Sequence, residues 1–180
     1  MILHLIIPYS RPEFLPIISN YFKPYNWIKL YFEQGKPPSG GDVRQKYLEL
    51  LRNDNDLQND YVHFLDDDNL IPHDVLTHIR YNANGVNILA YNQYWNAGNN
   101  NKFRLIAKPE NMMPSRCDIA QFFTPIKYLM DINWNLERYD NDGLFYMELH
   151  QKQADKFIFN NLYVWYNALR PVDNTFIIAE

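Results

Sequence analysis

Hydrophobic residues in the first half of the chain gather in short runs that are separated by amphipathic or polar segments. Residues 1–7 and 27–32 form two such runs, and residues 61–65 (YVHFL) form a third that ends at three consecutive aspartates. Short apolar runs that are rich in β-branched and aromatic residues and bounded by turn residues are typical of buried strands. We therefore predict strands over these three ranges and a fourth strand over residues 86–91.

Helical patterns separate these predicted strands. Ser10 is expected to cap the first helix, with Glu13 three residues later completing a capping box, and this helix is expected to end near Phe22. A second helix is expected to begin with Asp42 as its cap, and a third helix is expected after Pro72. Strands that alternate with helices predict βαβ units, so the sheet should be mainly parallel with helices on its faces.

The second half of the chain is less regular and is expected to hold one longer helix and several short strands. The helix is predicted over residues 144–153 after a loop over residues 134–142, and Thr124 and Pro125 are expected to begin a further helical segment. The strands are predicted at residues 103–107, 119–123, 157–159 and 163–166. Because no repeat, low-complexity segment or Gly/Ser linker interrupts the chain, residues 1–180 are expected to form one α/β domain.

The charge balance and the cysteine content narrow the class of protein. The chain carries 17 Lys and Arg against 21 Asp and Glu, which argues against a nucleic-acid binder that neutralises phosphates over a broad basic patch. Cys117 is the single cysteine, so no intramolecular disulfide can form. The N-terminal apolar run is too short for a signal peptide, and no apolar stretch approaches the ~20 residues that cross a bilayer. We therefore expect a soluble, cytoplasmic protein without a membrane span.

The most informative string is the acidic cluster Asp66-Asp67-Asp68, which directly follows the predicted strand 61–65. Ligands of open α/β sheets bind at the carboxyl ends of the strands, where this cluster would lie. Adjacent carboxylates repel one another, so each favours solvation, an ion pair or a cation. Mg2+ and Mn2+ prefer oxygen ligands and combine one or two carboxylates with phosphate oxygens and water. The cluster therefore predicts a site for a nucleoside diphosphate that carries Mn2+ or Mg2+.

A second interpretation of the same string is a solvated turn in which Asp68 or Asn69 caps the following helix. Other acidic motifs fit less well, because Leu70 and Ile71 stand where an EF-hand loop needs an oxygen ligand and a glycine. The chain has no Walker-type phosphate loop and no HExxH zinc motif, and its five histidines do not have a metal-binding spacing.

Three segments, in their order along the chain, resemble the GT-A glycosyltransferases, in particular the family 2-like group. They are Pro8-Tyr9-Ser10-Arg11-Pro12 after the first strand, Asp66-Asp67-Asp68-Asn69 after the third strand, and the later segment Tyr139-Asp140-Asn141-Asp142-Gly143. The resemblance extends over nearly the whole chain and implies a single GT-A (Rossmann-like) domain. It further implies a nucleotide-binding half over residues 1–92 and an acceptor and donor-sugar half over residues 93–180.

The resemblance also implies roles for residues near the ends of the predicted strands. Contacts with the base, ribose or diphosphate are implied for Pro8, Tyr9, Arg11, Glu33 and Arg44. Asp67 is implied near the ribose, and Asp66 and Asp68 are implied around the metal ion, with Asp68 as its firmest ligand. Asp118 and Gln121 belong to a segment that resembles the donor-sugar pocket, for which an ordinary strand with a polar edge is the alternative interpretation.

The activity that the resemblance implies is transfer of a sugar from a nucleoside-diphosphate sugar, with a UDP-sugar favoured, to a hydroxyl group of a glycan or another acceptor. Such a transfer needs stabilisation of the leaving diphosphate and removal of a proton from the acceptor hydroxyl. Asp142 is the predicted base of an inverting single displacement, because it opens a predicted helix and matches the late acidic position of the family, and Asp140 is the reserve. The alternative for Asp142 is a carboxylate that only stabilises the N-terminus of a helix.

Three other functions stay open at this point. A retaining GT-A enzyme would not use Asp142 as the base of a single displacement. A nucleotidyltransferase has a related sheet, but it is expected to carry a Gly-rich, basic loop after the first strand, where this chain has Pro8-Tyr9-Ser10-Arg11-Pro12. A non-catalytic module would bind a nucleotide or a glycan without turnover.

Overall fold

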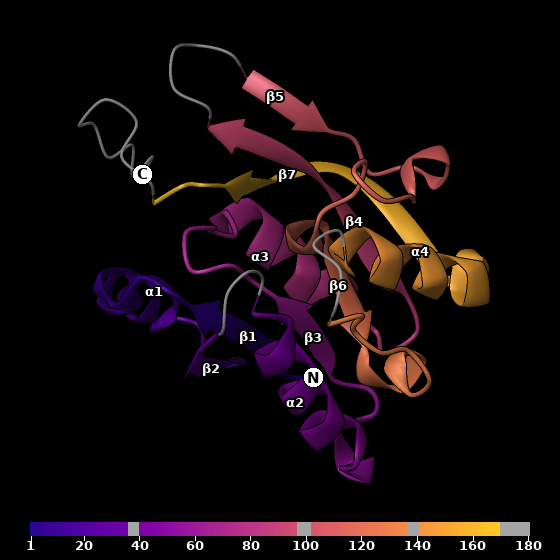
Figure 1. The fold of residues 1–180 in the computed structure, drawn as a ribbon, viewed down its shortest axis with the longest axis horizontal. Coiled ribbons are helices and arrows are strands. Elements are labelled where there is room, and N and C mark those ends of the chain that lie inside the picture. Colours follow the sequence, from indigo (N-terminus) through magenta and orange to yellow (C-terminus); the bar gives the residue numbers. More distant parts are fainter. Residues whose placement is uncertain (36–39, 97–101, 137–140, 170–180) are drawn as a thin grey trace.

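The computed structural model describes residues 1–35, 40–96, 102–136 and 141–169, which form an α/β architecture (Figure 1). Within these residues seven strands form a sheet in the order β2-β1-β3-β6-β4-β5, and β7 pairs with the other edge of β4. The strands are β1 (Leu3–Tyr9), β2 (Ile28–Gln34), β3 (Tyr61–Phe64), β4 (Ile88–Asn96), β5 (Lys102–Leu105), β6 (Phe122–Pro125) and β7 (Phe157–Tyr166).

Helices occupy the connections between these strands. The α-helices are α1 (Leu15–Phe22), α2 (Gly41–Arg52), α3 (His73–Asn82) and α4 (Asn141–Gln153). Short 3-10 helices are η1 (Pro12–Phe14), η2 (Asn55–Leu57), η3 (Pro109–Asn111), η4 (Ile119–Gln121), η5 (Ile126–Leu129) and η6 (Ala154–Lys156). In the part of the chain that the structure describes, none of these helices combines the length and the apolar character that spanning a membrane requires.

Five of the seven described strands run in the same direction. β1 is parallel to both of its neighbours, β2 and β3, and β4 is parallel to β7. β6 is antiparallel to β3 and to β4, so it runs against the other strands, as β5 does along β4. The prediction of an α/β domain with a mainly parallel central sheet flanked by helices is confirmed.

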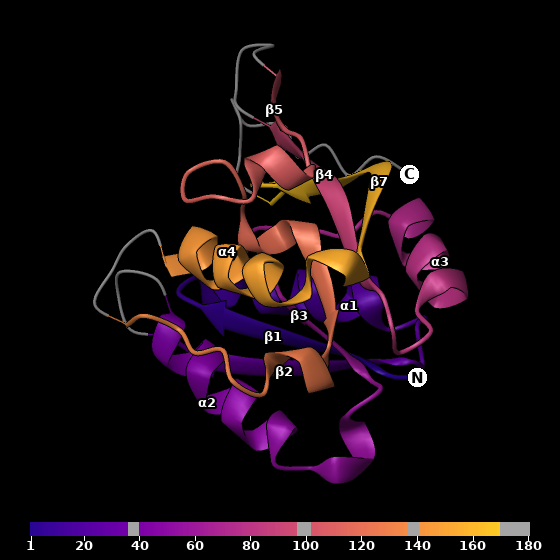
Figure 2. The same ribbon diagram turned by 90° about the vertical axis from the view of Figure 1, so that its right-hand side faces the viewer.

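Helices cover both faces of the sheet because successive residues of a strand point to opposite faces. In β1, Leu3, Leu5 and Ile7 pack with residues of α1 and α3, whereas Ile6 packs with residues of α2 and α4. Figure 2 shows α2 and α4 on the opposite side of the sheet from α3. Each fully buried side chain of this kind stabilises the fold by roughly 1.5–3 kcal/mol, so β1 anchors the centre of the domain from both faces.

The beginnings of the first two helices differ from the prediction. Ser10 does not cap the first one, because the chain enters it through the 3-10 turn η1, whose cap position is Arg11 and which no side chain caps. Ser10 instead donates from its amide and its hydroxyl to Oδ2 of Asp67, and hydrogen bonds to an ionised carboxylate are stronger than those between neutral groups. Gly40, and not Asp42, occupies the cap position of α2, and Asp42 lies in the first turn.

The second half departs further from the predicted pattern. The strand predicted at residues 119–123 is divided into η4 and β6, because Asp118 and Gln121 form a reciprocal capping box that turns the chain before the strand begins. Thr124 belongs to β6 and caps no helix, and the helical segment that follows is the short η5. The two strands predicted near the C-terminal end are one strand, β7, whose register with β4 shifts in its middle.

Candidate functional site

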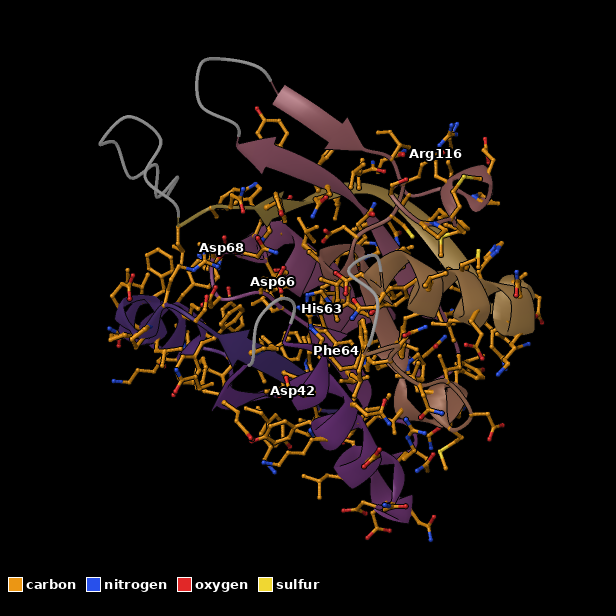
Figure 3. All side chains as sticks on the ribbon, viewed as in Figure 1. Asp42, His63, Phe64, Asp66, Asp68 and Arg116 are labelled. Atoms are coloured by element: carbon orange, nitrogen blue, oxygen red, sulfur yellow. The ribbon has the colours of Figure 1, made fainter. Side chains whose placement is uncertain are left out.

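The acidic cluster follows β3 at the edge of the sheet where β1 also ends. The parallel register places Ile6 of β1 beside Phe64 of β3, so the loops after both strands leave the sheet together. Figure 3 shows Asp66 and Asp68 near the middle of the view and Arg116 well away at the periphery. The carboxyl edge of an α/β sheet is where ligands bind, so this edge is the candidate site.

Asp67 is a buried member of the cluster and holds the loop that follows β1. Its Oδ2 accepts hydrogen bonds from the amides of Ser10 at 2.6 Å and Arg11 at 2.8 Å. Its Oδ1 accepts from Nε of Arg11 at 3.0 Å and from Nη2 of the same guanidinium. Burial alone would raise the pKa of Asp67, but these bonds outweigh burial and lower the pKa below its ordinary value. Asp67 is therefore ionised, and its oxygens are engaged within the chain.

Arg11 reaches from this loop to a second aspartate. Its Nη1 donates to Oδ2 of Asp68 at 2.9 Å, and the side chain of Asp68 is 2% exposed while that of Arg11 is 27% exposed. Burial would lower the pKa of Arg11, but Asp67 and Asp68 raise it, so the guanidinium stays charged. One guanidinium thus fixes the loop after β1 to two neighbouring carboxylates, a charge-assisted arrangement that is stronger than neutral hydrogen bonds.

Arg44 of α2 binds the remaining aspartate of the cluster and joins it to α4. Its Nη2 forms an ion pair with Oδ1 of Asp66, and its Nη1 donates to Oδ1 of Asp142 at 3.1 Å. The side chain of Arg44 is 3% exposed, whereas the side chains of Asp66 and Asp142 are 31% and 27% exposed. Asp142 lies in the first turn of α4, because this helix begins at Asn141, earlier than predicted. We call Arg44, Asp66 and Asp142 the Arg44 group.

Enclosure changes the pKa values of both carboxylates in the Arg44 group. Burial raises the pKa of Asp66; Arg44 opposes this rise, and the charges of Asp142 and Asp67 add to it. Burial also raises the pKa of Asp142, and Arg44 again acts in the opposite direction. A carboxylate whose pKa is raised is a stronger proton acceptor, which is the property that a general base requires.

Gln121, which the resemblance assigns to the donor-sugar pocket, has a structural role in the turn η4. It is fully buried, its Oε1 accepts from the amide of Asp118 at 2.8 Å, and its Nε2 donates to the carbonyl of Tyr91 at 3.1 Å. Asp118 completes the capping box by accepting from the amide of Ala120 at 2.9 Å. The amide group of Gln121 is thus engaged at both ends by the protein interior.

Asp118 differs from Gln121 because the carboxylates of the Arg44 group change its pKa. Its Oδ1 also accepts from Nε2 of Gln93 at 2.8 Å. Burial, followed by the negative charges of Asp66 and Asp142, raises the pKa of Asp118 to about 7. Its electrostatic coupling to this group is compatible with the place near a donor that the resemblance implies.

Pro8 and Tyr9 are the last two residues of β1, and Pro8 lies close to Gly40 at the start of α2. The carbonyl of Tyr9 accepts from the amide of Gly35 at 3.1 Å. Gly40 has a φ of +62°, and a Cβ at this position would lie 2.6 Å from Cβ of Pro8. Only glycine combines this left-handed conformation with so close an approach, so Pro8 and Gly40 together set where α2 begins.

Glu33 and Asp140 are the remaining residues that the sequence predicts for the site. Glu33 of β2 forms an ion pair with Lys46 of α2, with oxygen–nitrogen distances of 2.7 and 2.8 Å; the side chain of Lys46 is 55% exposed and that of Glu33 is 35% exposed. Asp140, the reserve for the base, lies outside the described residues. Glu33 is therefore available at the surface beside the carboxyl ends of β1 and β2.

The sequence reasoning missed the last part of β7 as a component of this edge. β7 forms an antiparallel bridge with Leu70, the amide of Asn167 donates to Oδ1 of Asn69 at 2.8 Å, and the amide of Leu169 donates to the carbonyl of Asp68 at 3.0 Å. The chain that leaves β7 is thus fixed to the backbone of the acidic cluster. No local pattern signals this contact, since Asn69 and Asn167 are 98 residues apart.

The donor atoms of the cluster suit a hard divalent cation that arrives with a diphosphate. Among the residues that the structure describes, no three or more His, Cys, Asp or Glu side chains are arranged to hold a metal ion by themselves. A cation that brings phosphate oxygens needs only one or two protein carboxylates. Asp66 and Asp68 are the cluster members that the resemblance assigns to this role, and each is paired with an arginine.

Several solved structures share this fold. The structure of residues 1–349 of TarS from S. aureus in complex with UDP matches with a TM-score of 0.56 at 14% identity, covering 92% of this chain and 60% of that chain. A longer TarS structure matches with a TM-score of 0.55 at 13% identity, covering 92% of this chain and 36% of that chain. A197 from STIV matches with a TM-score of 0.51 at 12% identity, covering 92% and 82% of the two chains. No protein-family model and no curated protein sequence matches the chain.

These likenesses define the class of the fold. TarS is a GT-A-type glycosyltransferase, so this chain has a glycosyltransferase-like fold. At identities of 12–14% the likeness extends to the fold alone. The chain spans 60% and 36% of the lengths of the two TarS chains, so it corresponds to part of them. The assignment to the family 2-like group stays a prediction.

Proposed function

We propose that this protein is a family 2-like GT-A glycosyltransferase that transfers a sugar from a nucleoside-diphosphate sugar to a hydroxyl group of a glycan or another acceptor. The observation that carries the proposal is the joining of Asp66 to Asp142 through Arg44 at the carboxyl edge of a glycosyltransferase-like sheet. A UDP-sugar is the favoured donor, because TarS, which shares the fold, is seen in complex with UDP.

The loop after β1 is proposed to bind the nucleotide together with the end of β2. The bonds from Ser10 and Arg11 to Asp67 hold this loop in place before any ligand arrives. A loop that is already ordered loses less conformational entropy on binding, which favours affinity. In this proposal Pro8 and Tyr9 line the base and ribose, and Glu33 of β2 meets the base.

Mn2+ or Mg2+ is proposed to bind between the acidic cluster and the diphosphate. Asp68 and Asp66 would hold the cation, since carboxylate oxygens suit both metals. When bound, the cation supplies stabilisation of the negative charge that develops on the leaving diphosphate. Because Asp68 is paired with Arg11 and Asp66 is paired with Arg44, each carboxylate must share its oxygens between the cation and a guanidinium.

Asp142 is proposed as the base of an inverting single displacement. It accepts the proton of the acceptor hydroxyl while that oxygen bonds to the anomeric carbon and the nucleoside diphosphate departs with the electrons of the broken bond. Its side chain is 27% exposed, so an acceptor can approach it, and burial raises its pKa above the ordinary value, which makes the carboxylate a stronger base. Asp140 is the reserve for this role.

A donor screen tests the proposal. The protein is incubated with Mn2+ and with UDP-, GDP- and dTDP-linked sugars, and the released nucleoside diphosphate is measured. We expect slow hydrolysis of one donor, loss of this activity with EDTA, and a fall of about 100-fold for Asp68→Asn. Asp155→Asn is the matched control, because Asp155 is 74% exposed and pairs with Lys156 beyond the far end of α4.

Other outcomes of the screen identify other functions. No release from any donor, with or without candidate acceptors, would contradict the proposal. Binding of UDP in calorimetry without any turnover would identify a non-catalytic nucleotide-binding module. Release of pyrophosphate from a nucleoside triphosphate and a sugar phosphate would identify a nucleotidyltransferase. The anomeric configuration of the product distinguishes an inverting from a retaining transfer.

A further inference from the structure

The guanidinium of Arg44 is held in place by aromatic side chains from the second half of the chain. Its Cζ lies 5.3 Å from the ring centroid of Trp134, a distance at which a cation is attracted to the ring face. Trp134 stacks on Phe145 of α4 with ring centroids 4.3 Å apart, and its amide donates to Oε1 of Gln45 at 3.0 Å. α2 and the segment that leads to α4 thus enclose the guanidinium of Arg44 between them.

The surroundings of Arg44 favour contact with carboxylates over contact with a nucleotide. Its side chain is 3% exposed, so little of it reaches a ligand directly. One terminal nitrogen binds Asp66, 22 residues away, and the other binds Asp142, 98 residues away. The resemblance implies an approach of Arg44 to the base or diphosphate, but in the structure both terminal nitrogens bind the protein's own aspartates.

The shape of the guanidinium makes Arg44 suited to fixing one carboxylate relative to another. An arginine presents its donors in a rigid planar fork, so two carboxylates on different nitrogens take a defined mutual position. Asp66 is the second residue after the end of β3, and Asp142 belongs to the first turn of α4. The fork therefore joins the end of the parallel part of the sheet to the helix that carries the proposed base.

Arg44 affects the proposed base, Asp142, through its charge as well as through the position of its guanidinium. Burial favours the protonated form of Asp142, and the guanidinium lowers its pKa again. A protonated carboxyl group cannot accept a proton from a hydroxyl. Arg44 thus helps to keep Asp142 in the form that its proposed role requires.

We propose that Arg44 is a positioning residue that holds Asp142 at a fixed place relative to Asp66 and so aligns the base with the bound donor. This inference rests on the proposed function, in which Asp66 meets the cation-bearing nucleotide and Asp142 accepts the proton. Misplacement of a reacting group by about 1 Å can lower a rate about 100-fold, so loss of the fork should lower kcat while donor binding persists.

Four variants separate positioning from direct binding: Arg44→Gln, Arg44→Lys, Asp142→Asn and the double variant Arg44→Gln/Asp142→Asn. Hydrolysis of the donor that the wild type turns over gives kcat and KM, and calorimetry with Mn2+ and UDP gives the Kd. We expect Arg44→Gln to lower kcat by about 100-fold with a change in Kd below about threefold. Arg44→Lys should recover part of kcat, because it keeps the charge without the fork. The double variant should be no slower than Asp142→Asn, because Arg44 acts through Asp142.

The matched control for these variants is Arg80→Gln on α3. Arg80 also lies over an indole, with Cζ 5.6 Å from the ring centroid of Trp27, but it is exposed and remote from the acidic cluster, so kcat should not change. Circular dichroism establishes that each variant is folded. If Arg44→Gln is unfolded, comparison of Arg44→Lys, alone and combined with Asp142→Asn, carries the test.

Each remaining outcome overturns the inference. A tenfold or greater rise in the Kd for UDP with kcat retained would mean that Arg44 contacts the nucleotide itself. Losses in kcat that multiply in the double variant would mean that Arg44 and Asp142 act independently. An unchanged kcat in folded Arg44→Gln, with an active wild type, overturns this inference alone, whereas a wild type without turnover overturns the proposed function as well.

Discussion

Arg11 and Arg44 divide the acidic cluster between them, and they do so in different settings. Arg11 is 27% exposed and binds Asp67 and Asp68, so all of its partners belong to the first half of the chain. Arg44 is 3% exposed and binds Asp66 of the first half and Asp142 of the second. Three consecutive carboxylates therefore serve two ion-paired groups, of which one orders a loop and the other joins the two halves of the domain.

The difference in burial decides how much each arginine contributes to stability. Removing one partner of a buried ion pair leaves a charge that neither water nor protein compensates, whereas an exposed partner is readily hydrated. The carboxylates that Arg11 leaves behind, Asp67 and Asp68, are 3% and 2% exposed, whereas those that Arg44 leaves behind are 31% and 27% exposed. The Arg11 contacts should therefore respond to substitution more strongly than the Arg44 group. Four variants, taken from the largest expected effect to the smallest, would sharpen or break this contrast.

Arg11→Met is expected to lower the free energy of unfolding most, by about 3 kcal/mol, because Asp67 and Asp68 stay buried after their guanidinium partner is removed. This value is at the lower end for a broken buried pair, because Asp67 keeps the amide bonds from Ser10 and from residue 11. Urea denaturation measures the change. Adding Asp68→Asn should recover part of the loss, and an Arg11→Met variant as stable as the wild type would break the contrast.

Gly143→Ala is expected to lower stability by about 2 kcal/mol, because it forces extra volume into a filled space. A Cβ at Gly143 would lie 2.6 Å from Cα of Pro114, so α4 or the neighbouring loop must shift and move Asp142 relative to Arg44. Thermal unfolding measures the loss. Gln151→Ala, at an exposed position of the same helix, is the control and should change little.

Arg44→Met is expected to cost less, about 1.5 kcal/mol, which is typical of lost hydrogen bonds to a charged group. Asp66 and Asp142 are partly exposed, so water compensates part of their charge. Urea denaturation alongside Arg11→Met compares the two arginines directly. A loss for Arg44→Met equal to or greater than that for Arg11→Met would reverse the proposed order.

Asp118→Asn is expected to have the smallest effect at acidic pH, and an effect that grows as the pH rises. The pKa of Asp118 is about 7 in the folded protein against an ordinary value of 3.8, so over this range the folded state holds a proton that the unfolded chain has lost. The contribution of Asp118 to stability is therefore present below the ordinary value and is lost as the pH rises toward 7. Asparagine removes this slope and can still accept the bonds from Ala120 and Gln93. Parallel pH profiles of the melting temperature for the two proteins would contradict the assignment.

The first half of the fold follows closely from the sequence. Residues 1–7, 27–32 and 61–65 were predicted as strands and correspond to β1, β2 and β3, because short β-branched runs between turn residues are local signals. The errors lie at helix starts. Serine is a residue type that commonly caps helices, but the amide of Ser10 donates to Asp67, 57 residues away. A contact with so distant a residue cannot be predicted from the local sequence pattern.

The second half of the fold depends on strand pairings that the local sequence pattern does not predict. β6 lies between β3 and β4 and antiparallel to both, although it comes after β4 and β5 in the chain. The segment of Asp118 and Gln121 was expected to resemble a donor-sugar pocket, with an ordinary strand edge as the alternative, and the capping box between these two residues turns the chain before β6 begins. Nothing in the spacing of apolar residues distinguishes a short strand from a capped turn followed by a shorter strand.

The sequence by itself determined that three carboxylates end a buried strand and that strands and helices alternate before them, because both are patterns among near neighbours. Only the tertiary structure decided which arginine each carboxylate binds. In particular, it placed Asp142 on one terminal nitrogen of Arg44 and Asp66 on the other. The physical reason is that an ion pair needs only a short distance in space, and the fold brings together residues that the chain separates by 98 positions.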